Sequence, residues 1–181
     1  MAAWARCRAR TVHTTDAFTD WIRRDVRPFF PHEFFVAAYG RITGNTFDVK
    51  VLIPVGCPPP LAEALERRAL LHRYGMFSRW IVEREPILIH DRSTLNQLAP
   101  DERDDIETFN LLGLVVHGFV DRDSGLASYF CFARVPQPLY ALHERKAWVM
   151  AATVHTNLTS VAARMTDPAA STLAIARSLR S

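Results

Sequence analysis

The chain has 181 residues, of which 49% are hydrophobic, 23% charged and 10% aromatic, and this composition is that of one globular domain with its own core. It excludes a disordered tail, a collagen-like rod and a coiled coil, and a net charge of +3 is too small to indicate a nucleic-acid surface. The sequence has neither a secretory signal nor an apolar run of the roughly 20 residues that a membrane helix needs, so we expect a cytoplasmic protein without membrane contact.

The first half of the chain predicts a helix, a β-hairpin and a second helix. Residues 14–29 repeat apolar side chains at helical spacing. Residues 34–56 contain two strand-like runs around the turn 43–45, and the second run alternates apolar and polar side chains. Residues 61–83 have one apolar helical side, with an interruption expected near Gly75.

The second half predicts a short strand, a short helix, a second hairpin and a long helix. Residues 86–89 suit a short strand, and residues 100–105 begin a helix with acids near its N-terminus. Residues 111–135 are two strand patterns joined by turn-forming residues. A long helix is expected over 138–164, and a final short helical piece starts at Pro168.

This order of elements predicts an α+β fold. Two hairpins that lie far apart in the chain and are linked by helices suit a five-stranded, mostly antiparallel sheet flanked by helices. This architecture is that of the GAF and PAS sensory domains, in which one sheet face and its helices often enclose a pocket.

Three segments resemble the N-terminal sensory domain of LuxR-type transcriptional regulators, in the subgroup associated with bacterial exopolysaccharide gene clusters. These segments are Phe29–Gly40, Leu114–Asp121 and Ser128–Arg134. The resemblance spans most of the chain, and on it we expect an N-terminal extension over 1–13, a GAF-like sensory domain over 14–165 and a tail or linker over 166–181.

The resemblance implies an autoinducer-binding-like domain that precedes a DNA-binding helix-turn-helix of roughly 60 to 70 residues. Only residues 166–181 follow the predicted long helix, and they are too few for that unit. We therefore expect either a truncated product or a regulator that does not touch DNA itself.

Five side chains are candidates for lining a ligand pocket: Tyr39, Trp80, His117, Tyr129 and Cys131. By strand alternation Tyr39 shares a face with Phe35, and Tyr129 shares one with Cys131. Amphipathic rings suit a small amphipathic ligand, and the alternative for each residue is ordinary core packing. In acyl-homoserine lactone receptors a Trp, a Tyr and an Asp hold the ligand, and this pattern has no position-by-position match here.

Histidines offer two further hypotheses. His32 and Glu33 form either an acid-base pair or half of a metal site, or else a polar pair that bonds local backbone at the start of a strand. His117 either hydrogen-bonds a ligand or is a core histidine with an internal partner. No third ligand or nucleophile stands at a recognisable spacing from His32 and Glu33.

No other motif indicates an enzyme, a metal site or a cofactor. The three cysteines Cys7, Cys57 and Cys131 form no CxxC pair, so we expect reduced thiols and no zinc site. Phosphate-binding loops and a nucleophile elbow are missing from the sequence. Five arginines alternate with glutamates, which predicts solvated ion pairs: Arg67, Arg68, Arg73, Arg79 and Arg84.

The long helix suggests self-association. Trp148, Met150 and Val154 are expected to add a second apolar strip beside Leu139 and Leu142, which predicts a symmetric homodimer, with single-chain packing as the alternative.

The sequence thus predicts a non-enzymatic sensory module that binds a small molecule or a partner, dimerises and controls a DNA-binding domain outside this chain. One alternative is an interaction module that forms mixed dimers with full-length regulators. The other is a small enzyme that uses His32, Glu33 or His117.

Overall fold

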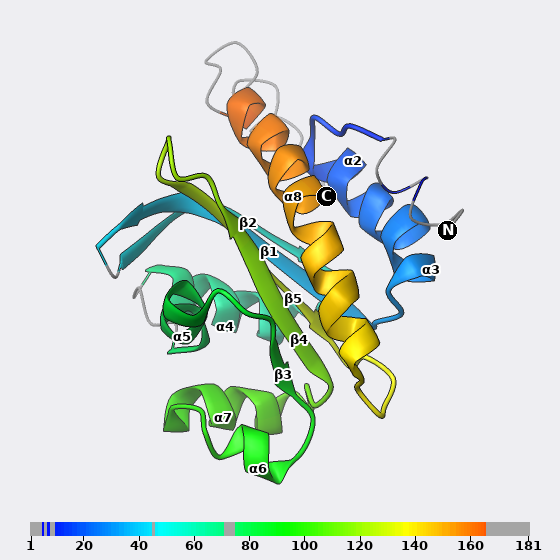
Figure 1. Ribbon diagram of the computed structural model, residues 1–181, viewed down its shortest axis with the longest axis vertical. Helices are drawn as coiled ribbons and strands as arrows, with labels where there is room; N and C mark the ends of the chain where they lie inside the picture. Colours follow the sequence, from blue (N-terminus) through cyan, green and yellow to red (C-terminus); the bar gives the residue numbers. More distant parts are fainter. Residues whose placement is uncertain (1–4, 6, 8–9, 45, 71–74, 166–181) are drawn as a thin grey trace.

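The computed structural model describes residues 5, 7, 10–44, 46–70 and 75–165. A central sheet lies between two layers of helices (Figure 1). The helical piece expected from Pro168 lies outside the described residues.

The sheet has five strands in the order β2-β1-β5-β4-β3, and every neighbouring pair is antiparallel. The strands are β1 (Phe34–Thr43), β2 (Thr46–Val55), β3 (Ile87–Ile89), β4 (Leu114–Val120) and β5 (Leu126–Ala133). The two predicted hairpins, β1–β2 and β4–β5, join through the pairing of β1 with β5. The predicted α+β fold with a five-stranded antiparallel sheet is confirmed.

One face of the sheet is covered by α2 (Thr15–Trp21), η1 (Ile22–Val26), α3 (Arg27–Phe29) and α8 (Ala141–Met165). The first three elements are one continuous helical stretch with a π-helical middle, as predicted for residues 14–29, and the Thr14 side chain caps it by accepting from the Ala17 N–H at 3.2 Å. Phe18 and Trp21 are buried here with strand residues such as Phe35.

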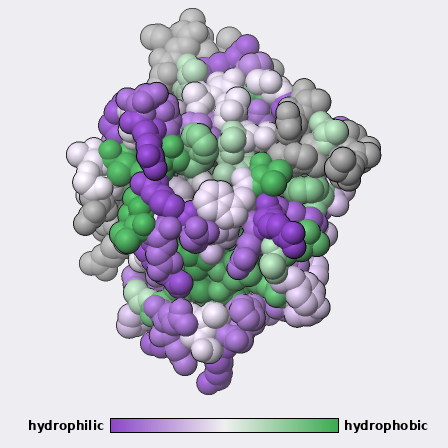
Figure 2. All heavy atoms as spheres, viewed as in Figure 1, coloured by the Kyte–Doolittle hydropathy of each residue, from purple (hydrophilic) through white to green (hydrophobic). Residues whose placement is uncertain are grey.

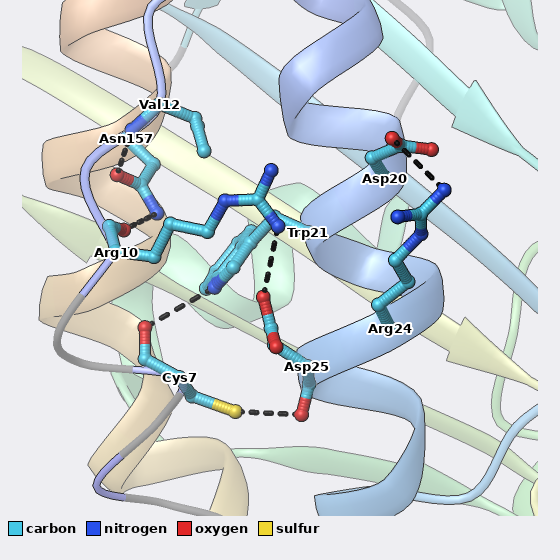
Figure 3. A network of polar contacts seen from close by, with 8 residues as sticks. All are labelled: Cys7, Arg10, Val12, Asp20, Trp21, Arg24, Asp25 and Asn157. Atoms are coloured by element: carbon cyan, nitrogen blue, oxygen red, sulfur yellow. Dashed lines mark hydrogen bonds and ion pairs between the residues drawn. The ribbon is translucent and has the colours of Figure 1, made fainter.

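Part of the N-terminal segment also packs on this face (Figure 3). The side chains of Cys7 and Val12 are fully buried or nearly so. The Trp21 indole donates to the carbonyl of Cys7 at 3.1 Å, and the Val12 N–H donates to Asn157 of α8 at 3.2 Å. The sequence suggested that this segment is an extension. These contacts instead make Cys7 and Val12 part of the core that the sheet and α8 share.

Helix α8 has one apolar side, and this side faces the sheet. It begins at Ala141, three residues after the predicted start at Pro138. Met150 and Val154 are fully buried against the sheet, so the prediction of a second, outward-facing strip containing them is wrong. Their spacing from Ala147, at i+3 and i+7, puts all three residues on the same stripe. Trp148 remains about half exposed.

The other face is covered by α4 (Pro59–Leu70), α5 (Gly75–Glu83), α6 (Arg92–Leu95) and α7 (Pro100–Thr108). Within the predicted long helix over 61–83 the structure describes α4 and α5, and residues 71–74, between them and next to the interruption expected near Gly75, lie outside the described residues. Helix α6 was not predicted, and it starts with a capping box between Asp91 and Thr94.

The surface on the side viewed in Figure 2 is mainly hydrophilic, and hydrophobic residues appear on it in several separate groups. Among the described helices, none is long and apolar enough to span a membrane.

Candidate ligand-binding site

A cavity of about 120 Å³ lies between the sheet and the layer formed by α4, α5 and α7. Its wall is mostly apolar. The strands contribute Val36, Ala38, Leu52, Val116, Tyr129 and Cys131, and the helices contribute Leu61, Leu65, Met76, Phe77 and Ile106.

The strand side of the cavity follows from the pleat and the register of the sheet. Val36 lies opposite Cys131 and Ala38 lies opposite Tyr129, so four alternate residues of β1 and β5 face the same helices. Ala38 also lies opposite Leu52 of β2. Because the alanine side chain is a single methyl group between two larger side chains, it leaves space above the centre of the sheet.

Charged side chains form one end of the cavity wall: Arg68 of α4 with Glu102 and Asp105 of α7. The Arg68 guanidinium is ion-paired with Asp105 and, at 3.0 Å, with Asp101, and it also donates to the Asp101 carbonyl. Only 17% of the Arg68 side chain is exposed, so the prediction of a solvated ion pair is wrong for this residue. It holds for Arg79, which pairs with Glu83 at 3.0 Å and is 40% exposed.

Glu102 joins α7 to the start of α5. Its carboxylate accepts the Met76 N–H at 2.8 Å, and its side chain is so close to Gly75 that an added Cβ would lie 2.5 Å from one carboxylate oxygen. Glu102 is 7% exposed, and burial raises the pKa of its carboxyl. Glu102 was not predicted from the sequence, because the N–H group that it accepts belongs to a residue 26 positions away.

Three of the five sequence-selected residues lie at this cavity or beside it. Tyr129 and Cys131 line it. Trp80 adjoins it, with its ring centroid 5.6 Å from that of Tyr129 and 5.7 Å from that of Phe77, which also lines the cavity.

His117 lies at the edge of the sheet and connects the two helical layers. Strand β3 pairs only with Leu114–Val116, so His117 is beyond the end of that pairing. Its Nδ1 accepts the Trp80 indole N–H at 3.1 Å, and its ring centroid is 4.4 Å from that of Trp148 on α8. A neutral imidazole that accepts at Nδ1 carries its proton on Nε2, which has no hydrogen-bond partner among the described residues. Burial lowers the pKa of His117 to about 4.

Tyr39 lies on the opposite face of the sheet, beside α8. Its ring centroid is 5.7 Å from that of His155, and it does not line the cavity. The strand alternation places it there, since it shares a face with Phe35, as the sequence analysis expected.

His32 and Glu33 have separate partners. Nδ1 of His32 donates to the Phe30 carbonyl at 2.6 Å, while Glu33 is ion-paired with Arg134 at 2.9 Å. This arrangement is that of polar residues that fix the start of β1. Within the described part of the chain, no group of three or more His, Cys, Asp or Glu side chains could hold a metal ion.

We expect the native thiols to react slowly. Burial raises the pKa of Cys57 to about 11 and that of Cys131 to about 12, and Cys7 is fully buried. At pH 8 only about 1 in 1,000 Cys57 side chains is a thiolate, whereas an ordinary cysteine is about a quarter ionised. Labelling with a chromogenic disulfide reagent should be slow in the native protein and reach three thiols per chain in denaturant. Rapid native labelling of Cys57 or Cys131 would contradict the burial described here.

The fold has relatives among solved structures, whereas no protein-family model and no curated protein matches the sequence. CepR2 from Burkholderia cenocepacia is described as an N-acylhomoserine lactone dependent LuxR family transcription factor. It is similar with a TM-score of 0.65 and 16% identity, over 92% of this chain and 98% of that chain.

SdiA from Escherichia coli is similar with a TM-score of 0.60 and 11% identity over 86% of this chain, which spans 63% of the SdiA chain. SdiA in complex with octanoyl-rac-glycerol gives a TM-score of 0.61 and 10% identity, over 88% of this chain and 63% of that chain. A GAF domain/HD domain protein from Geobacter sulfurreducens gives 0.56 and 13%, over 82% of this chain and 94% of that chain. The chain therefore has the α+β fold shared by LuxR-type autoinducer-binding domains and GAF domains.

Proposed function

We propose that this chain is a sensory domain that binds a small amphiphilic molecule in the cavity between the sheet and α4, α5 and α7. The observation that carries the proposal is the apolar cavity with charged side chains at one end. The fold supports it, because the similar proteins include a lactone-dependent regulator and a protein in complex with octanoyl-rac-glycerol. Trp80, Tyr129 and Cys131 are the sequence-selected residues to which we assign a role at the ligand.

Ligand binding requires a movement of the helical layer. A cavity of about 150 Å³ accepts a group the size of benzene, and the cavity here is about 120 Å³. A ligand with a longer chain therefore binds a form in which α4 or α5 lies further from the sheet, and it increases the population of that form. This change in the helical layer is the signal in our proposal.

We place this domain in a cytoplasmic LuxR-type regulator of the exopolysaccharide-associated subgroup, where it controls a DNA-binding unit outside the sequence. Self-association is part of the proposal, since α8 leaves Leu142, Trp148 and Val149 about half exposed. The molecular mass in solution, with and without ligand, tests this part.

The substitution Ala38→Leu tests the cavity. It adds three carbon atoms to the cavity wall. These atoms fill empty space, so the fold is retained, but less of the cavity volume remains for a ligand. We expect octanoyl-rac-glycerol to bind the wild-type chain saturably at one site, and to bind Ala38→Leu at least about ten-fold more weakly, by calorimetry or tryptophan fluorescence. Ala152→Leu, on the exposed side of α8, is the matched control and should bind as wild type does. Unchanged affinity in Ala38→Leu would place the ligand elsewhere.

A further inference from the structure

The charges at the cavity wall are unbalanced. Arg68 is the one cation among the residues that line the cavity in the described part of the chain, and Glu102 and Asp105 are the anions there. Asp101, which also pairs with Arg68, adds a third carboxylate at this end. Three carboxylates against one guanidinium leave a formal charge of −2 when all are ionised.

Each of the three nitrogens of Arg68 donates to a protein acceptor. Its Nε donates to Asp105, one terminal nitrogen donates to Asp101 Oδ2 at 3.0 Å, and the other donates to the Asp101 carbonyl. Three of its five N–H groups are thus committed, and its positive charge is already paired with the carboxylates of Asp105 and Asp101. Among the described residues, this end of the cavity therefore offers a ligand acceptor oxygens and no cation whose charge is not already paired.

Among these three carboxylates, Glu102 is the one whose ionised form a charged ligand stabilises or destabilises most. It is buried, and one of its oxygens already accepts the Met76 N–H. A buried carboxylate is stabilised by an added positive charge or donor and destabilised by an added anion, and both effects are stronger away from water.

From this juxtaposition of an apolar cavity with an acidic end we propose that the ligand is an aliphatic amphiphile with a positively charged, hydrogen-bond-donating head group. The inference rests on the proposed function of the cavity. The alkyl chain of the ligand lies among the apolar residues that line the cavity near Ala38, and its head group lies at Glu102 and Asp105. A neutral hydroxyl head binds more weakly than an ammonium head, and a carboxylate head of equal chain length binds most weakly.

A series of eight-carbon compounds tests this order. Octylamine, 1-octanol and octanoate are titrated against the full chain at pH 7 by calorimetry. We expect octylamine to bind at least about ten-fold more tightly than octanoate, with 1-octanol between them. Glu102→Gln keeps an acceptor for the Met76 N–H and removes the charge. It should therefore reduce the ratio of the octylamine affinity to the octanoate affinity at least about three-fold. Glu107→Gln removes a charge from the exposed side of the same helix and should leave the ratio unchanged.

The outcomes separate the two proposals. If octanoate binds as tightly as octylamine, or if Glu107→Gln reduces the ratio as much as Glu102→Gln does, the head-group inference fails while the cavity remains a binding site. If none of the three compounds binds and octanoyl-rac-glycerol does, the inference fails in the same way. If none of the four compounds binds, the proposed function fails. If Glu102→Gln does not fold, as judged by thermal unfolding, Asp105→Asn makes the same test.

Discussion

Between pH 6.5 and pH 4 the protein is expected to lose on the order of 3 kcal/mol of its free energy of unfolding through His117, and a similar amount through His32. Burial lowers the pKa of both side chains from 6.5 to about 4. Each remains neutral in the folded protein, whereas the unfolded chain takes up a proton as the pH falls below 6.5. The stability from these groups is therefore complete above pH 6.5 and is lost as the pH approaches 4.

The environments of the two rings explain the shifts. Nδ1 of His117 accepts the Trp80 indole N–H, so a proton can bind there only if this hydrogen bond breaks. His32 is 6% exposed and lies with its ring centroid 5.0 Å from that of Phe132. Its Nδ1 already donates to the Phe30 carbonyl, so a second proton would charge the ring in apolar surroundings.

Urea unfolding at pH 7.0, 5.5 and 4.5 measures the effect. His117→Gln retains an acceptor for the Trp80 N–H and cannot titrate, so it should lose about 2.5 kcal/mol less than wild type between pH 7.0 and pH 4.5. His90→Gln, at an exposed position, is the control and should follow the wild-type pH dependence. Identical pH dependence in wild type and His117→Gln would show that His117 is not held neutral.

Gly118→Ala should destabilise the protein by about 3 kcal/mol, the upper end of the usual cost of overpacking. A Cβ at this position would lie 2.4 Å from the Ser128 carbonyl oxygen and 2.7 Å from the Trp80 ring. The carbonyl belongs to the neighbouring strand and cannot move without breaking the pairing of β4 with β5. The indole can move only by giving up its contact with the strand and its hydrogen bond to His117.

Two measurements distinguish this clash from a general effect of removing glycine. In Gly118→Ala the pKa of His117, followed by NMR, should rise toward its ordinary value, because displacing the Trp80 indole exposes the imidazole to water. Gly125→Ala is the comparison variant: its φ is +68°, but the nearest atom to the added Cβ is 3.6 Å away. It should cost only about 1–2 kcal/mol, from backbone strain, with the pKa of His117 unchanged. A small effect in Gly118→Ala and an unchanged His117 pKa would contradict the close approach of Trp80.

The fold was predictable because its main signals are local. The alternation in residues 34–56 and 111–135 defines both hairpins, and the spacing of apolar residues defines α2 and α8. The packing of the N-terminal segment was not predictable, since Val12 bonds Asn157 across 145 residues. The acidic end of the cavity was not predictable for the same reason. Arg68 is bonded to Asp105, which lies 37 residues away, and the residues next to Arg68 in sequence suggested a solvated helix.

The site was predictable only as far as strand alternation reaches. Alternation correctly grouped Tyr129 with Cys131 and put Tyr39 with Phe35. It does not indicate which of two helical layers leaves a void, because that depends on the size of residues such as Ala38 and on helices that are distant in sequence. It also could not show that the shortness of β3 leaves His117 within reach of Trp80.

The hydrogen bond between Trp80 and His117, which passes around the edge of the sheet, links protonation of His117 to the packing of α5. Nδ1 of His117 is available to a proton only when the Trp80 N–H has left it, and Trp80 leaves only if α5 loosens its contact with β4. A proton taken up there therefore favours the loosened form that we propose for the ligand-bound helical layer, as any species that binds one of two forms must. On this proposal mild acid destabilises the form in which α5 packs closely on the sheet, and it acts through the hydrogen bond between Trp80 and His117.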